Sequence, residues 1–363
     1  MTAEAWLDGI AAAIPPIDAA AAAVASTHLD RLTKPPGSLG GLEAIAIRLA
    51  GIRGRIVTDI ERPVVIVFAA DHGVAARGVS AYPPEVTAQM VANFAAGGAA
   101  INVLARAAGA NLVVVDIGVG GAVAAHASVA GSDAGVRLVQ ARVANGTRDL
   151  TTGPAMTRAE VTAAIDVGRE VVSGLIRDGI DLVGLGEMGI GNTTAASAIV
   201  AALTGLPPST VTGRGTGVDD PGLVRKVAAI EAALAHHGLD RADPLGILAA
   251  VGGLEIAGLV GAMLAAAAAR IPVVLDGFIT GAAALVATGL APNLAGRLIA
   301  AHRSVEPGHA IVLERLGLSP ILQLDLRLGE GSGAALAIPI IRAAARIGGE
   351  MATFDEAGVS GAG

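Results

Sequence analysis

The sequence predicts an α/β protein built around a mostly parallel β-sheet that is covered by helices on both faces. Short runs of β-branched residues alternate along the chain with longer Ala-rich segments. Each short run is continuously apolar, as expected for a strand that is buried on both sides. The chain has 363 residues, a length that allows about two domains. With 53% hydrophobic and 16% charged residues, it can also bury one sizeable core.

The apolar runs predict five strands, and the segments between these runs predict helices. The strands are expected at residues 64–69, 112–117, 136–140, 182–185 and 273–275. The clearest helix is 157–177, where apolar residues recur at helical spacing behind a capping box of Thr157 and Glu160. A second helix is expected at 192–203. Residues 1–30 and those after about 292 show no strong strand pattern, so we expect them to form a small helical domain beside a large domain at 31–291.

Composition argues against nucleic acid and membrane partners. One Trp, one Tyr and four Phe leave few aromatic platforms for bases, and a net charge of −7 repels phosphate backbones. No apolar run is convincing as a membrane span, and Glu4 and Asp8 stand where a signal peptide needs positive charge. The absence of cysteine excludes thiolate chemistry and disulfides. The expected location is cytoplasmic.

Polar, glycine-rich sequence follows four of the strands. These strand ends are Asp71-His72-Gly73, Asp116-Ile117-Gly118, the segment 184–187, and Asp276-Gly277. Parallel sheets bind ligands at the carboxyl ends of their strands, so four such ends in one chain favour a site over isolated turns.

The segment GLGEMGIGNTT at 184–194 combines a strand, a glycine loop and a helix start. Glycines and a helix N-terminus let backbone amides approach an anion, so Gly189, Gly191, Asn192 and Thr193 are candidate phosphate ligands. The loop only partly matches the dinucleotide and P-loop motifs, which weakens both nucleotide interpretations and leaves a site for one phosphate. The alternative is a glycine turn capped by Asn192.

A carboxylate in the middle of this loop would need a nearby cation to stabilise its charge. Glu187 would face the phosphate, and its expected partner is Lys226, Arg214 or Arg225 farther along the chain.

A second glycine loop, RLGEGSG at 327–333, holds Glu330 immediately before an apolar helix. The glutamate either favours the helix N-terminus or serves as an accessible proton acceptor, and the local sequence does not decide between them. Two further segments, 32–43 and 79–87, read as stiff turns that lead into helices, and the single Tyr, Tyr82, suggests a pocket wall. The seven His show no metal-ligand spacing, so no metal site is expected.

Together these segments resemble the nicotinate-nucleotide:dimethylbenzimidazole phosphoribosyltransferase family. The matching segments follow the family's order over nearly the whole chain: LTKPPGSLGGLE (32–43), FAADHGV (68–74), GVSAYPPEVT (78–87), VDIGV (115–119), GLGEMGIGNTTAASA (184–198), GRGTG (213–217), LDGFI (275–279) and LDLRLGEGSGAALA (324–337). The resemblance implies a Rossmann-like large domain, a small helical domain built from both chain ends, with the 292–363 segment carrying the catalytic loop, and a homodimer without a cofactor.

The resemblance also implies a reaction and residue roles. The substrates would be nicotinate mononucleotide and 5,6-dimethylbenzimidazole, and the products α-ribazole 5′-phosphate and nicotinate. By motif, Glu330 resembles the catalytic base, Glu187, Gly189 and Lys226 resemble the nucleotide and phosphate contacts, and Ser80, Tyr82, Gln89 and Leu328 fall at the expected base pocket.

The chemistry is consistent with one base and no metal. Nicotinate leaves a pyridinium as a neutral ring, so a single carboxylate that accepts the azole proton is enough. Attack from the opposite face would invert the anomeric carbon. Two other functions stay open: a metal-dependent phosphohydrolase using Asp71, His72, Asp116 and Asp276, and a non-catalytic nucleotide-binding module.

Overall fold

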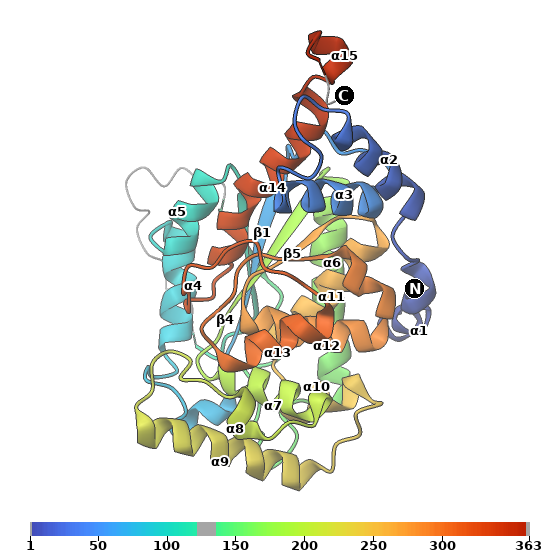
Figure 1. Cartoon of the computed structure of the whole chain (residues 1–363). Coiled ribbons are helices and arrows are strands. Elements are labelled where there is room, and N and C mark those ends of the chain that lie inside the picture. Colours follow the sequence, from blue (N-terminus) through green and yellow to red (C-terminus); the bar gives the residue numbers. More distant parts are fainter. Residues whose placement is uncertain (1, 122–135, 361–363) are drawn as a thin grey trace.

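Six parallel strands form one central sheet in the order β3-β2-β1-β4-β5-β6 (Figure 1). The structure is a computed structural model that describes residues 2–121 and 136–360. The strands are β1 Pro63–Ala70, β2 Asn111–Gly118, β3 Val136–Gln140, β4 Leu182–Met188, β5 Val273–Leu275 and β6 Leu298–Ala300. The predicted α/β class is confirmed, and the strand order is that of the Rossmann fold.

Helices pack against both faces of this sheet. Every residue of β1 is buried, with Val64, Ile66 and Phe68 in one core cluster and Val65 and Val67 in the other. The first cluster includes residues of α6 Arg158–Arg177, α7 Asn192–Thr204, α10 Pro244–Val251, α11 Leu254–Ala268 and α12 Phe278–Leu290. The second includes residues of α3 Gly41–Arg53, α4 Val86–Ala96, α5 Ala100–Ala107 and α14 Ser332–Glu350. Burial on both sides explains why β1 is apolar at every position, whereas the edge strand β3 is largely exposed.

The helix cap and the strands that the sequence predicts most clearly are present in the structure. Thr157 caps α6 and Glu160 returns the hydrogen bond, as the capping box predicts. The five predicted strands are present with small differences at their ends. The sixth strand, β6, was not predicted and lies in the segment after residue 292 that the sequence assigned to helices. It pairs with β5 through only three residues, too few to show a periodic pattern.

The helix α2 near one end of the chain lies beside α14 near the other end (Figure 1). The helix α2 Ala19–Asp30 and the segment after it meet the last turns of α14 and α15 Phe354–Ala357 through three hydrogen bonds. His28 Nε2 lies 2.8 Å from the Gly348 carbonyl, and the Thr33 amide donates to the Ala352 carbonyl at 3.0 Å. The first helix, α1 Ala3–Ala13, instead contributes Ile10 to the core cluster on the α6 side of the sheet.

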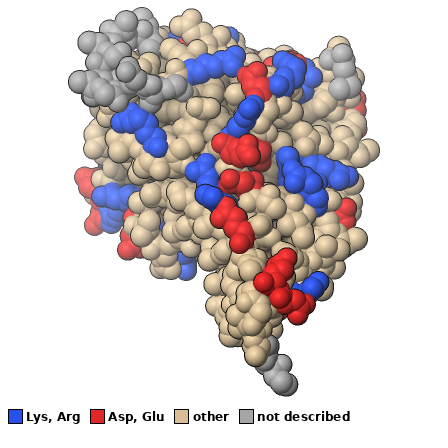
Figure 2. All heavy atoms as spheres, turned by 90° about the horizontal axis from the view of Figure 1, so that it is seen from above, with Lys and Arg blue, Asp and Glu red and all other residues tan. Residues whose placement is uncertain are grey.

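The remaining elements surround the carboxyl ends of the strands or connect the layers. They are the 3₁₀ turns Gly73–Arg77 and Pro292–Arg297, α8 Pro208–Val211, α9 Asp220–His237 and α13 Pro307–Leu316. One stretch of the described chain, Val86–Ala107, is long and apolar enough to cross a membrane by length and composition, and half of it is buried inside the fold. Figure 2 shows acidic side chains along the middle of one face with basic ones on both sides, so the two signs of charge are mixed there.

Candidate active site

The site lies where the strand order reverses. The strand β1 has β2 on one side and β4 on the other, so the segments after β1 and β4 diverge and leave a crevice at the carboxyl edge of the sheet. A cavity opens beside this crevice, at the carboxyl ends of β4, β5 and β6. Its walls come from four segments: 187–193 at the end of β4, 277–279 after β5, 302–306 after β6, and 327–329 before α14, with Gly215 and Thr216 beside them. The predicted position at the strand ends therefore matches the geometry.

Glu187 is a buried carboxyl group in an acidic environment. The Asn192 side-chain amide donates a hydrogen bond to its Oε2. Burial raises the pKa of Glu187 well above its usual range, and the negative charges of Glu255, Asp276 and Glu330 raise it further. These effects outweigh the opposing hydrogen bond from Asn192, so the pKa of Glu187 stays raised.

The expectation that a cation pairs with Glu187 is wrong for all three candidates. Lys226 donates to Thr193 Oγ1 at 2.7 Å and to the Gly213 carbonyl at 3.1 Å. Arg214 pairs with Asp220, and Arg225 donates to the Gly78 carbonyl at 3.2 Å. Each of these cations has a partner elsewhere in the fold, which local sequence alone does not reveal.

Lys226 lies instead beneath the start of α7. Its side chain is fully buried on α9, and burial lowers its pKa to about 8 while Glu306 opposes the shift. A Cβ at Gly215 would lie 2.6 Å from Thr193 Oγ1 and 3.0 Å from Lys226 Nζ, so only glycine allows this loop to approach both. The helix N-terminus, Thr193 and Lys226 thus converge on one edge of the cavity, an arrangement suited to an anion.

Glu330 lies on the facing loop in a strained conformation. Its φ is 64°, in the left-handed region that a non-glycine residue rarely adopts. Its amide donates to the Glu187 carbonyl at 3.2 Å. A Cβ at Gly186 of β4 would lie 2.1 Å from the Gly331 nitrogen, so glycine at 186 is needed for the loop to pack directly on the strand.

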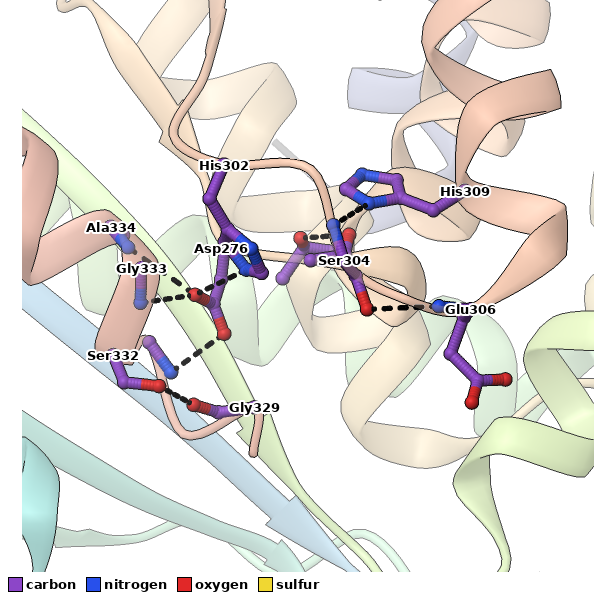
Figure 3. Close-up of polar contacts among 12 residues, drawn as sticks. Asp276, His302, Ser304, Glu306, His309, Gly329, Ser332, Gly333 and Ala334 are labelled. Carbon is purple, nitrogen blue, oxygen red and sulfur yellow. Dashed lines mark hydrogen bonds and ion pairs between the residues drawn. The ribbon is translucent and has the colours of Figure 1, made fainter. Parts of the chain in front are cut away.

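Asp276 at the end of β5 holds this loop from the other side (Figure 3). Its carboxylate accepts hydrogen bonds from the amides of Gly331 at 3.1 Å, Gly333 at 2.6 Å and Ala334 at 3.3 Å. These are the first amides of α14, whose positive end favours the charge. Sequence reasoning considered Asp276 only as a hydrolase residue, and the structure gives it this positioning role.

The environment of Glu330 suits proton transfer. Its side chain is buried, and Oε2 has no hydrogen-bond partner among the described residues. Burial raises its pKa to about 7, and the nearby Asp276 charge adds to the rise. A carboxylate with a pKa near 7 is matched to general-base work at neutral pH.

The segment after β6 supplies a wall that the sequence did not predict. His302, Ser304 and Glu306 all line the cavity (Figure 3). The Ser304 amide donates to His309 Nδ1 at 2.9 Å, and burial lowers the His309 pKa to about 3, so this ring is a neutral acceptor that holds the segment in place. Glu306 Oε1 accepts from the Gly215 amide at 2.8 Å. Recognition of β6 would have flagged the polar residues that follow it.

Of the four predicted base-pocket residues, Leu328 lines the cavity and Ser80 contacts a residue that lines it. Ser80 Oγ is 3.2 Å from Thr216 Oγ1, which lines the cavity. Leu328 lines the cavity and is 55% exposed, Tyr82 is 54% exposed, and Gln89 is exposed on α4. Apolar side chains this exposed at a cavity mouth are available to a flat aromatic ligand.

The four residues of the hydrolase alternative have separate partners. Asp116 pairs with Arg142 at 2.9 Å, Asp71 accepts from the Gly120 amide at 2.7 Å, and His72 Nε2 lies 2.7 Å from Glu255 Oε1. Asp276 caps α14, as described above. Within residues 2–121 and 136–360, no group of three or more His, Cys, Asp or Glu side chains is arranged to hold a metal ion.

Comparisons with known proteins agree with this geometry. A family model described as phosphoribosyltransferase matches residues 14–359. The chain is 56% identical over 347 residues to the nicotinate-nucleotide–dimethylbenzimidazole phosphoribosyltransferase of Chloroflexus aggregans, covering 96% of each chain. It is 51% identical over 360 residues to the enzyme of the same name from Salinispora tropica, covering 98% of this chain and 99% of that one.

A solved structure extends the match to three dimensions. The crystal structure of the Thermus thermophilus enzyme of that name superposes with a TM-score of 0.87 at 49% identity, covering 95% of this chain and all of that one. Sequence and fold therefore agree, and the chain belongs to the nicotinate-nucleotide–dimethylbenzimidazole phosphoribosyltransferase family.

Proposed function

We propose that this phosphoribosyltransferase moves the 5-phosphoribosyl group of nicotinate mononucleotide to 5,6-dimethylbenzimidazole or a related azole. The products are α-ribazole 5′-phosphate and nicotinate. The observation that carries the proposal is Glu330, a buried carboxyl group with an unpartnered Oε2 and a pKa raised to about 7 beside the cavity. Family membership supplies the reaction class.

Glu330 acts as the general base. One nitrogen of the azole attacks C1′ of the ribose, and the C1′–N bond to nicotinate breaks with its electron pair going to the pyridinium nitrogen. The second azole nitrogen then becomes acidic, and its proton passes to Glu330. Nicotinate departs as a neutral ring, so no general acid is required. Attack opposite the leaving group inverts the anomeric carbon from β to α.

The surrounding carboxyl groups favour a cationic substrate. Asp276 and Glu330 lie near Glu187, which lines the cavity, and their charges raise the Glu187 pKa. The pyridinium of the substrate and the positive charge that develops on the ribose are stabilised by such a negative environment.

The start of α7 provides the phosphate subsite. Gly189, Gly191, Asn192 and Thr193 carry amides and a hydroxyl at the helix N-terminus, and Lys226 Nζ lies 2.7 Å from Thr193 Oγ1. Binding of the phosphate there orients the ribose, so binding energy remote from C1′ assists the transfer. Leu328 in the cavity wall, together with Ser80, Tyr82 and Gln89, would contact the azole.

The test is a metal-free incubation of the purified protein with both substrates, followed by chromatography with mass detection. Nicotinate and a phosphoribosylated azole, both dependent on the azole, are the expected products. Loss of the nucleotide without azole would instead indicate hydrolysis, and binding without turnover would indicate a nucleotide-binding module.

Three further proposals concern organisation. The chain works as a homodimer and in the cytoplasm, and it divides into a large domain at 31–291 and a small helical domain from 1–30 and 292–363. Light scattering on the purified protein and fractionation of cells test the first two. Limited proteolysis near residues 30 and 292 tests the division.

A further inference from the structure

His72 and Glu255 form a buried pair outside the lining of the cavity. His72 lies just after β1, and Glu255 lies in the first turn of α11. His72 Nε2 is 2.7 Å from Glu255 Oε1, and both side chains are completely buried. The other polar atoms of these groups, His72 Nδ1 and Glu255 Oε2, have no hydrogen-bond partner among the described residues. Neither residue takes part in the proposed transfer.

Burial of this pair is costly for the fold. Removal of two ionisable groups from water is unfavourable, and one hydrogen bond with two unpartnered polar atoms offsets little of the cost. Apolar side chains of similar size are often as stabilising in such a place, or more so. Packing alone therefore does not account for the pair, and buried ionisable groups beside a cavity are typical of functional sites.

The glycine loop at the end of β4 packs directly on His72. A Cβ at Gly189 would lie 3.3 Å from His72 Cδ2, and a Cβ at Gly191 would lie 3.3 Å from His72 Cβ. Glycine at both positions lets the loop approach the histidine this closely. The same loop lines the cavity with Glu187 and Asn192. The His72 side chain therefore supports this part of the cavity wall.

Glu255 acts on the same loop through its charge. Burial is the main reason that the pKa of Glu187 is raised, and among the negative charges that add to the rise Glu255 has the largest effect, ahead of Asp276 and Glu330. Glu187 thus faces acidic groups from α11, from the end of β5 and from the loop before α14, and only the hydrogen bond from Asn192 opposes them. His72 fixes the direction of the Glu255 carboxylate through Oε1.

We propose that His72 and Glu255 are positioning residues for the transfer: the His72 ring supports the 187–192 loop, and Glu255, held by His72, presents its charge to Glu187. This inference rests on the proposed transferase function and adds to it two residues that do not touch the substrate. The supported loop keeps Glu187 and Asn192 in the cavity wall. The Glu255 charge sets the pH at which Glu187 ionises.

The first experiment measures binding of nicotinate mononucleotide between pH 5 and pH 9 by calorimetry, without azole, so that no transfer occurs. Glu187→Gln identifies the step of the binding profile that belongs to Glu187, because the variant lacks this step. Glu255→Gln keeps a hydrogen-bond acceptor for His72 and removes the charge. We expect it to move the Glu187 step to lower pH by about one unit. The ligand phosphate titrates at about pH 6 in every sample, so only differences between proteins count.

A matched control removes another buried carboxylate. Glu43 on α3 is paired with Lys34 at 2.8 Å and lies outside the lining of the cavity. Glu43→Gln should therefore leave the Glu187 step at its wild-type pH.

Two double variants separate the positioning role from a need for the pair in folding. His72→Phe with Glu255→Met replaces the pair by apolar side chains of similar size and keeps a ring beneath the loop. We expect this variant to be at least as stable as wild type, with its Glu187 step at lower pH. His72→Ala with Glu255→Met also removes the ring. It should bind the nucleotide about 10-fold more weakly than the Phe variant, because the loop loses its support, while KM for the azole changes by less than about twofold.

Each part of the proposal can fail by itself. A Glu187 step that stays at its wild-type pH in Glu255→Gln and in the Phe variant, or a wild-type profile without a step that Glu187→Gln removes, would overturn the role of Glu255. Equal nucleotide binding by the Phe and Ala variants, or equal losses for nucleotide and azole, would overturn the role of the His72 ring. These results leave the transferase function intact. Wild-type protein that binds the nucleotide but forms no phosphoribosylated azole would overturn the proposed function instead.

Discussion

Replacement of Glu330 by glutamine separates the catalytic role of this residue from its cost to stability. Glutamine keeps the size of the side chain and removes its ability to accept the azole proton. Loss of a positioned general base lowers rates by about 10²- to 10⁴-fold, so we expect kcat to fall by at least about 10²-fold with little change in nucleotide binding. Wild-type kcat should rise with pH through about 7, because only ionised Glu330 accepts the proton.

The same substitution should stabilise the fold at high pH. A rise of the Glu330 pKa from 4.5 to about 7 corresponds to about 3 kcal/mol at about 1.36 kcal/mol per unit. Because the folded-state pKa is raised, the folded protein holds more protons than the unfolded chain between these values, and stability falls as pH rises through the window. Above pH 7 the whole penalty is present in the wild type and absent from the variant.

The assay therefore has two readouts. Product formation gives kcat, and thermal unfolding of both proteins at pH 5 and pH 8 gives the difference in stability. We expect the variant to gain stability relative to wild type between pH 5 and pH 8. Turnover within about tenfold of wild type would refute the role as base. A stability difference that does not change with pH, or that grows in favour of wild type, would refute the account of the buried charge.

Three other perturbations test the rest of the site. Lys226→Ala should raise KM for the nucleotide more than KM for the azole, and equal increases would mean that Lys226 only supports the structure. Asp276→Asn should move the acid limb of the pH profile to lower pH, because a charge that raises the Glu330 pKa is lost, and should also lower kcat, because the loop loses its carboxylate anchor; an unmoved limb would contradict the first effect. A chelator should leave turnover unchanged. If a chelator abolished turnover and a divalent metal restored it, the hydrolase alternative would be favoured.

The fold was predictable where several signals coincide. The runs at β1, β2 and β4 are long, apolar and buried on both faces, so composition and length specify them together. The strand β6 has three residues and owes its conformation to pairing with β5, a contact between residues about 25 positions apart. Local sequence therefore does not predict this pairing.

The site was predictable in its glycine loops and not in its long-range partners. Glu187 and Glu330 stand out because glycines surround them, and close packing of the loop on β4 requires glycine at 186. The partner of Lys226 was predicted incorrectly because Thr193 and the Gly213 carbonyl are brought to it only by the packing of α9. His302, Ser304 and Glu306 were missed with the strand that precedes them.

The accumulation of carboxyl groups at the switch point is a cost that the substrate offsets. Asp276 and Glu255 raise the pKa of Glu187, and Asp276 raises that of Glu330, so these two glutamates are harder to ionise. A cationic pyridinium that enters this environment relieves the repulsion, and the relief contributes to binding. After transfer the nicotinate ring is neutral and the attraction to it is gone, while Glu330 has taken up a proton. The same electrostatics that favour capture of the charged nucleotide therefore favour release of the leaving ring, and a site with its carboxyl groups replaced by amides would lose both.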